Sequence, residues 1–183
     1  MKNFLTTKSN LGWLILLLML ATQLNSEATS YAKPQSRTIK SANGQYTLIT
    51  NPKSQEHQVY ASKNLNTPLW SFKLVMWHFP IYLSNDGQKV CHLAWRHVRE
   101  DQLKRDCVTF RNAQGIIKSH PFSSICPNPP KTQAVGPGPI GDFWRTWYRE
   151  ATSDSETVTV RTTRDKTFTF SFKNGKIVSK EPR

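Results

Sequence analysis

The chain has 183 residues, of which 37% are hydrophobic and 20% are charged, and its formal net charge is +13. This balance excludes a polytopic membrane protein and argues against a wholly disordered chain. The 11 Pro, 8 Gly and 6 Trp also exclude a coiled coil and a collagen-like chain. What remains is one ordinary domain, preceded by a short apolar segment.

The first segment predicts export. Lys2 and Lys8 give it a positive start, and an uninterrupted apolar run from Leu11 to Ala21 follows. That run is shorter than the roughly 20 apolar residues that cross a bilayer. We therefore expect a helical signal peptide over residues 1–28 and a periplasmic or secreted mature protein, with an uncleaved N-terminal anchor as the alternative. Small residues at the spacing that signal peptidase requires offer two cleavage sites, after Ala28 (with Ser26) or after Ala32 (with Ser30).

Beyond a disordered lead-in expected over residues 29–40, apolar and polar residues alternate with the period of two that predicts β-strands. One short stretch, Val98–Lys104, is the only expected helical piece. Near the end of the chain, Asn174-Gly175 supplies the positive-φ pair of a hairpin turn. The expected strands are Gln45–Thr50, Gln58–Ser62, Leu69–Leu74, Ile81–Leu83, Lys89–Trp95, Asp106–Arg111, Ile116–His120, Phe143–Glu150, Thr157–Thr163, Thr167–Phe172 and Lys176–Ser179.

A short motif recurs along the chain. The run Ser41–Leu48 is similar to Ser84–Cys91, and a degenerate third copy begins at Ser153. In each copy a turn with Asn or Asp leads into a strand. This motif resembles the turn between the first two strands of a blade in WD40-like and TolB-type β-propellers, and the resemblance implies a protein-interaction scaffold in the cell envelope.

The expected strands are too few for four full four-stranded blades. We therefore expect an all-β fold over residues 41–181, in which antiparallel blade-like meanders form a compact sandwich-like or partial-propeller domain. The Pro-rich segment 127–139 is an internal loop of this single domain.

Three cysteines in an exported chain allow one disulfide. Alternation places Cys91 with Leu93 and Trp95 on the core face, so Cys91 is expected to be a buried free thiol. The remaining pair, Cys107 and Cys126, is expected to form the bridge, which would stabilise the fold by roughly 3 kcal/mol. Because His92 faces the opposite side of its strand, it cannot activate Cys91 as a nucleophile.

The common catalytic motifs are absent from the sequence. It contains no His-Glu-x-x-His, no Gly-x-Ser-x-Gly and no glycine-rich phosphate loop. The histidines do not form a local ligand pair, so no metal and no other cofactor is expected. The sequence therefore favours a binding protein over an enzyme. The enzyme alternative is a small exported hydrolase that pairs His78 or His120 with a nearby Asp.

Two aromatic segments, Trp77–Tyr82 and Phe143–Arg149, are the most unusual feature. In the second, alternation sets two arginines and a tryptophan on one face, where they offer stacking and cation–π contacts to a ligand. The alternative is that these rings are core residues with arginine stems lying over them. The candidate ligand-binding residues are Trp77, His78, Tyr82, Arg145, Trp147 and Arg149.

Together these features predict an exported binding module with an aromatic and basic surface. The positive charge favours an anionic partner. The expected partners are an envelope protein, a glycan or an anionic envelope polymer, with no nucleic acid, and the protein is expected to be a monomer. A structural envelope accessory without a ligand is the remaining alternative.

Overall fold

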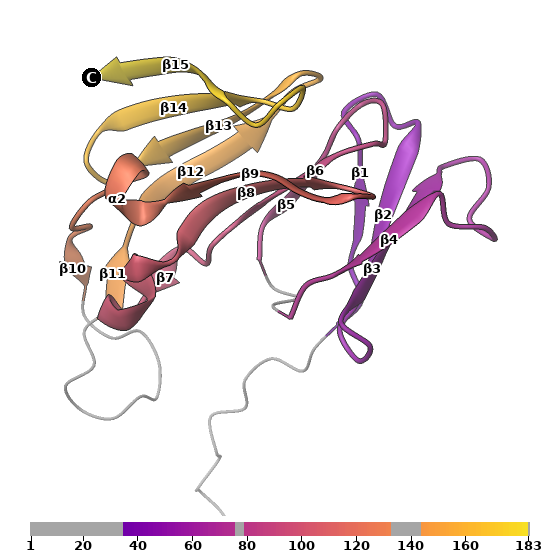
Figure 1. The fold of residues 1–183 in the computed structure, drawn as a ribbon, viewed down its shortest axis with the longest axis horizontal. Coiled ribbons are helices and arrows are strands. Elements are labelled where there is room, and N and C mark those ends of the chain that lie inside the picture. Colours follow the sequence, from indigo (N-terminus) through magenta and orange to yellow (C-terminus); the bar gives the residue numbers. More distant parts are fainter. Residues whose placement is uncertain (1–34, 76–78, 133–143, 183) are drawn as a thin grey trace, which may run out of the picture. The chain divides into compact units, whose positions relative to one another are not determined.

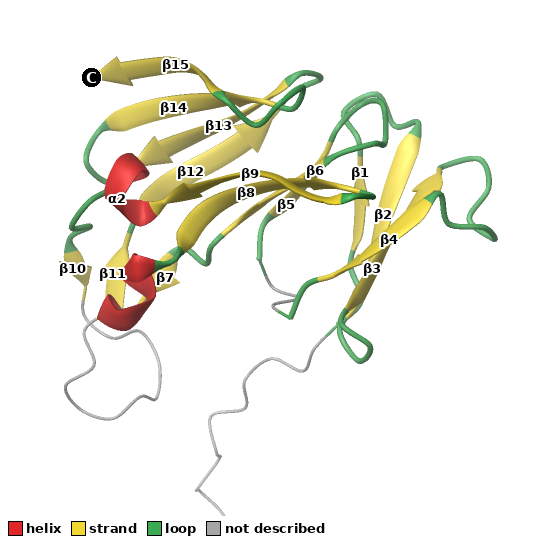
Figure 2. Ribbon diagram, in the orientation of Figure 1, coloured by secondary structure: helices red, strands yellow, loops and turns green. Residues whose placement is uncertain are grey.

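The computed structural model describes residues 35–75, 79–132 and 144–182. These residues belong to one compact unit that begins at Pro34. Antiparallel strands dominate it and form four sheets (Figures 1 and 2). In this part of the chain no helix has the length and apolar character needed to cross a membrane. The expected all-β fold of antiparallel meanders is confirmed.

The first sheet is a meander of four consecutive strands. It runs β1 (Thr38–Lys40), β2 (Tyr46–Asn51), β3 (Glu56–Ala61) and β4 (Trp70–Lys73). The first of these falls within the segment that the sequence predicted to be a disordered lead-in. That prediction is wrong for residues 38–40, because they pair with β2 along their whole length, with Thr38 opposite Ile49.

Two further four-stranded meanders follow in chain order, which is the blade-like arrangement that the sequence predicted (Figure 1). The second sheet contains β5 (Ile81–Leu83), β6 (Val90–Leu93), β8 (Asp106–Asn112) and β9 (Gly115–Pro121). The third sheet contains β12 (Tyr148–Ser153), β13 (Thr157–Thr162), β14 (Lys166–Ser171) and β15 (Ile177–Pro182).

A small sheet combines one strand inserted between β6 and β8 with two strands that follow β9. Its strands are β7 (His97–Val98), β10 (Lys131–Thr132) and β11 (Trp144–Thr146). Two short helical turns accompany it, η1 (Glu100–Lys104) and α2 (Phe122–Ile125). The single strand expected over Phe143–Glu150 is wrong, because the chain leaves β11 at Trp147 and enters β12, which belongs to another sheet.

The repeated motif forms equivalent turns, each between the first two strands of its sheet. In the first copy Ser41 Oγ donates to Asn43 Oδ1 at 2.8 Å and accepts the backbone N–H of Tyr46 at 3.0 Å. In the second, Ser84 Oγ donates to Asp86 Oδ1 at 2.6 Å and accepts the N–H five residues further on at 3.0 Å. The predicted correspondence of these two segments is confirmed.

The third copy keeps the position of the turn, but an aspartate side chain bonds the backbone in place of the serine. It joins β12 to β13, and Asp154 Oδ1 accepts the backbone N–H groups of Glu156 and Thr157 at 2.8 and 2.7 Å. An acidic or amide side chain that bonds its own backbone is a general way to form a tight turn. The motif thus marks the start of all three meanders.

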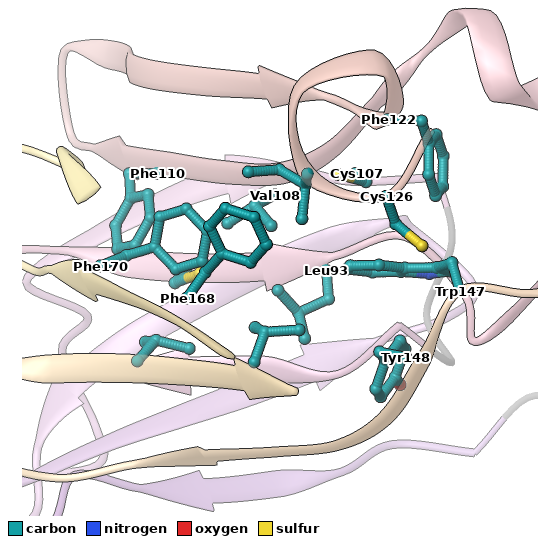
Figure 3. Packing of buried hydrophobic residues seen from close by; sticks show 14 of the residues in the cluster. Leu93, Cys107, Val108, Phe110, Phe122, Cys126, Trp147, Tyr148, Phe168 and Phe170 are labelled. Carbon is teal, nitrogen blue, oxygen red and sulfur yellow. The ribbon is translucent and has the colours of Figure 1, made fainter. Parts of the chain in front are cut away.

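Two buried clusters hold the sheets together. The second sheet contributes residues to both clusters, so both of its faces are covered. Along β6, Val90 packs toward the first sheet, whereas Cys91 and Leu93 pack toward the third. We call the two contact regions the first junction and the second junction. The first contains Leu48, Val59, Trp70, Phe72, Ile81, Leu83 and Val90. The second contains Cys91, Leu93, Val108, Phe110, Val158, Val160, Phe168, Phe170 and Phe172, and it continues into the residues around Trp147 (Figure 3).

Candidate functional site

An apolar cleft of about 340 Å³ lies where β6 ends and the chain turns into β7. Segments that are far apart in the sequence contribute to it, namely the β4–β5 connection, the β6–β8 connection and the start of α2. Its lining residues are Val75, Phe79, Ala94, Trp95, Val98, Gln102, Arg105, Asp106 and Phe122.

The deep part of the cleft is core-like and its mouth is exposed. Val98 and Phe122 are buried, each only 2% exposed. Trp95, by contrast, is 42% exposed and Val75 is 65% exposed. A large exposed ring beside a preformed apolar hollow is the usual composition of a binding pocket, with apolar walls and a few polar groups.

The backbone around Trp95 is fixed from both sides. Ala94 N donates to Cys107 O at 2.8 Å, which ties the end of β6 to β8. The indole Nε1 of Trp147 donates to the carbonyl oxygen of Trp95 at 2.8 Å. The Trp147 ring in turn packs edge-on against Phe122 with 5.3 Å between ring centroids. A buried aromatic pair therefore supports the cleft from behind (Figure 3).

One wall of the cleft is polar and retains hydrogen-bonding capacity. Gln102 Oε1 accepts the backbone N–H of Arg99 at 2.9 Å, while its side-chain amide N–H groups have no bond within the described chain. Neither Arg105 nor Asp106 has an ion-pair partner among the described residues. Both side chains are exposed at the end of η1. Donors and an acceptor thus lie next to the apolar floor.

Trp147, a predicted ligand-binding residue, is a core residue. Its side chain has no exposed surface. The expectation that it faces outward is wrong, because the strand breaks at this position and the ring enters the cluster that contains Cys126 and Tyr148 (Figure 3). It acts on the cleft indirectly, through its hydrogen bond to the Trp95 carbonyl.

Arg145 also has a supporting position. Its Nη2 donates to both carboxylate oxygens of Glu100 at 2.9 and 3.0 Å, and its Nη1 donates to Pro129 O at 2.8 Å. Its side chain is 13% exposed. The fork therefore anchors η1, the turn that carries Gln102, and does not present a charge to solvent.

The remaining predicted site residues lie apart from one another. Arg149 Nη1 pairs with Asp165 at 3.2 Å on the surface. Tyr82 lies in the second junction, where its hydroxyl donates to Ala151 O at 2.9 Å, and burial raises its pKa to about 12. Trp77 and His78 fall outside the described residues. The four predicted residues that the structure describes do not lie together on one face.

The predicted Cys107–Cys126 disulfide is not formed. All three cysteines are free and buried. Cys107 Sγ donates to His120 O at 3.3 Å, whereas Cys126 Sγ lies 3.9 Å from Thr163 Oγ1. Burial raises the pKa of each thiol. The expected burial of Cys91 is confirmed.

His120, a histidine of the hydrolase alternative, is part of the core. Its Nε2 lies 2.7 Å from Gly175 O, and its ring packs on Phe170 with 4.9 Å between centroids. Within the described residues, no three His, Cys, Asp or Glu side chains gather to hold a metal ion. The contacts of His120 are those of a structural residue in the second junction.

Sequence reasoning missed the cleft because it placed Trp95 within a strand and on its core face. In the structure β6 ends at Leu93. The signal was present in the polar pair Arg96-His97, which breaks the alternation immediately after the tryptophan. A polar pair at this place is more typical of a strand that has ended than of one that continues.

No protein-family model and no curated protein matches the chain. Among solved structures it is similar to the β-propeller domain of Cps50 (Swd1) from Myceliophteria thermophila, with 13% identity and a TM-score of 0.35 over 80% of this chain and 43% of that one. It is also similar to Hsv2 from Kluyveromyces lactis, with 9% identity and a TM-score of 0.40 over 83% and 48% of the two chains. The chain spans less than half the length of either structure. Likenesses this distant carry no statement about function.

Proposed function

We propose that this protein is an exported binding module, and that its cleft beside Trp95 receives an apolar side chain of a partner protein. The observation that carries the proposal is the half-exposed indole at the mouth of a hollow with a buried apolar floor. Exposing a large aromatic ring forgoes the stabilisation that its burial would provide. Aromatic residues in such positions are enriched at sites where proteins bind one another.

The proposal of export is supported by the sequence. The apolar run Leu11–Ala21 lies behind a positive start and ahead of small residues suited to cleavage. Expression with the native N-terminus, followed by N-terminal sequencing of the secreted or periplasmic fraction, tests this part. We expect a mature chain that starts at Thr29 or Lys33. Full-length protein retained in the cytoplasm would contradict it.

The charge of the chain supports an acidic partner. The formal net charge is +13, and the stretch 96–106 beside the cleft carries four basic residues, Arg96, Arg99, Lys104 and Arg105, against three acidic ones, Glu100, Asp101 and Asp106. Excess charge of one sign steers oppositely charged molecules toward a protein and raises their rate of association. Of the partners that the sequence predicted, we therefore place an envelope protein first and propose that its surface is acidic.

The cleft is tested with an uncharged probe, N-acetyl-phenylalanine amide, followed by amide chemical shifts in NMR. We expect saturable shifts at Ala94 and Phe122, and their loss in Trp95→Ala. This variant keeps the backbone carbonyl that Trp147 bonds, so the support behind the cleft is retained. Ile116→Ala is the matched control, because Ile116 is 63% exposed and does not line the cleft. Shifts that persist in Trp95→Ala would disprove the proposed site.

A further inference from the structure

We propose that the ligand of the cleft is the C-terminal residue of a polypeptide, bound through its apolar side chain and its free carboxylate. This inference rests on the proposed function and adds the chemistry of the ligand. It follows from the size of the cleft and from the three polar side chains on its wall, Gln102, Arg105 and Asp106.

The size of the cleft limits the ligand. A volume of about 340 Å³ lies at the low end of the range of roughly 300–1,000 Å³ for ligand pockets. It corresponds to roughly ten water molecules at about 30 Å³ each. One large side chain and the main-chain atoms next to it fill this space, whereas an extended segment does not.

The donors of the wall suit a carboxylate. Arg105 N donates to Gln102 O at 3.0 Å, which closes η1 and holds the two residues on one turn. The guanidinium offers a planar fork that matches the two oxygens of a carboxylate, and the amide of Gln102 adds a further N–H. The nearby Arg145 is not available, because Glu100 already occupies its fork.

Asp106 favours a peptide C-terminus over a ligand that has a carboxylate but no peptide N–H, such as a fatty acid. Its carboxylate is an acceptor only, and it follows Arg105 directly in the chain. A peptide C-terminus brings the N–H of its last residue, which Asp106 accepts while Arg105 holds the carboxylate. A fatty acid brings a carboxylate next to Asp106 as a peptide does, but it has no N–H that offsets the repulsion between the two carboxylates. An internal peptide segment with an apolar side chain leaves Arg105 without its anion.

The test compares two peptides, Gly-Ser-Gly-Ser-Phe with a free C-terminus and the same peptide with a C-terminal amide. Both carry fluorescein at the N-terminus, and their binding to the purified protein is followed by polarisation. We expect the free acid to bind at least about tenfold more tightly, which is the usual effect of one charge-assisted hydrogen bond. Equal affinities for acid and amide would overturn the inference.

Variants of the wall assign the effect to Arg105. We expect Arg105→Gln to bring the affinity for the acid down to that for the amide. Lys104→Gln is the matched control, because it removes the same charge from the preceding residue, which does not line the cleft. It should keep the tenfold preference. Both positions are exposed, so the thermal unfolding midpoints should match that of the parent protein. A preference that survives in Arg105→Gln would overturn the inference.

Two competing ligands test whether the cleft prefers a peptide C-terminus over an internal peptide segment and over a fatty acid. Gly-Ser-Phe-Ser-Gly carries the ring at an internal position and dodecanoate represents a fatty acid, and neither should displace the acid peptide better than the unlabelled amide peptide does. Stronger displacement by either would overturn the assignment to a C-terminus. If N-acetyl-phenylalanine amide binds at Trp95 but acid and amide peptides bind alike, the inference fails and the proposed function stands. If none of the probes binds, both fail.

Discussion

The two junctions differ in polarity, although the strands of the second sheet contribute to both. The second junction is built around phenylalanine rings, and Phe110, Phe168 and Phe170 are at most 1% exposed. Phe110 packs against Phe170 (Figure 3), with 6.1 Å between ring centroids. It also packs edge-on against Phe172 at 6.0 Å. The stability of this junction rests on apolar burial and close packing.

The first junction combines apolar residues with buried polar groups. His57 is fully buried, and its Nε2 lies 3.0 Å from Leu74 O. Arg111 lies over the Phe72 ring at 5.1 Å and donates to Lys73 O at 3.0 Å, which ties β8 to β4. The register of β6 and β8 places His92 diagonally next to Arg111 on the same face.

Three buried atoms of the first junction have no hydrogen-bond partner. They are His57 Nδ1, His92 Nδ1 and Arg111 Nε. Each unsatisfied buried polar group costs about 1–3 kcal/mol. The second junction therefore holds the fold together, whereas the first sheet is attached less firmly. Its attachment depends on the protonation of the buried histidines.

The largest expected effect tests the apolar junction. We expect Phe110→Ala to reduce the free energy of unfolding by about 3–5 kcal/mol, because a buried ring is replaced by a cavity that its neighbours fill only in part. Urea unfolding followed by circular dichroism measures this change. Since the ring lies in the main core, we expect one cooperative transition. A loss below about 1 kcal/mol would show that the second junction is not the main source of stability.

A glycine in the repeated turn tests the first junction. Gly87 has a φ of +66°, and a Cβ at this position would lie 2.2 Å from the Tyr46 ring. We expect Gly87→Ala to cost about 2–4 kcal/mol from the left-handed backbone and the forced repacking together. Hydrogen exchange measures it, and the loss of protection should be concentrated in β2, β3 and β4.

The first copy of the turn supplies the matched control. Gly44 has a φ of +70°, but nothing lies within 4 Å of the place where its Cβ would be. We expect Gly44→Ala to cost only about 1–2 kcal/mol, the backbone contribution alone. Equal losses in the two variants would mean that the contact between Gly87 and Tyr46 does not contribute to the junction.

Acid tests the histidines and gives the smallest expected effect. Burial, together with the nearby Arg111 and His57, lowers the pKa of His92 from 6.5 to about 3. The pKa of His57 is also lowered, chiefly by burial, with Arg111 and Arg37 adding to the effect. The folded state therefore binds fewer protons than the unfolded state below pH 6.5, so stability falls as the pH falls. Between pH 7.5 and 5 we expect His92 alone to account for a loss of up to about 2 kcal/mol.

Urea unfolding at several pH values measures this loss, and His92→Gln is the diagnostic variant. The variant should lose less stability than the parent protein between pH 7.5 and 5, since one titrating group has been removed. Carboxylates that are stabilised in the fold, such as Asp86, act at lower pH and in the same direction. Identical pH dependence in the two proteins would show that His92 is not buried as described.

Local patterns were enough to predict most of the strands and the repeated turns. Alternation located Ile81–Leu83 with its correct bounds, and the Asn-Gly and Asp-Gly pairs marked turns whose glycines have positive φ. These features are local, because side-chain period and turn chemistry act over a few residues. The two-residue strands of the small sheet and the turn α2 are too short to carry a period, and they were missed.

The sequence by itself determined which residues alternate, where the chain turns and that the strands form antiparallel meanders. Only the tertiary structure decided which faces are covered. Alternation assigns residues to two faces of a strand but does not say which face meets another sheet, and the second sheet is covered on both. The tertiary structure also decided where strands end. Because β6 ends at Leu93, Trp95, expected in the core, lies exposed at a cleft, while Trp147, a candidate surface residue, follows the end of β11 and lies buried behind the cleft.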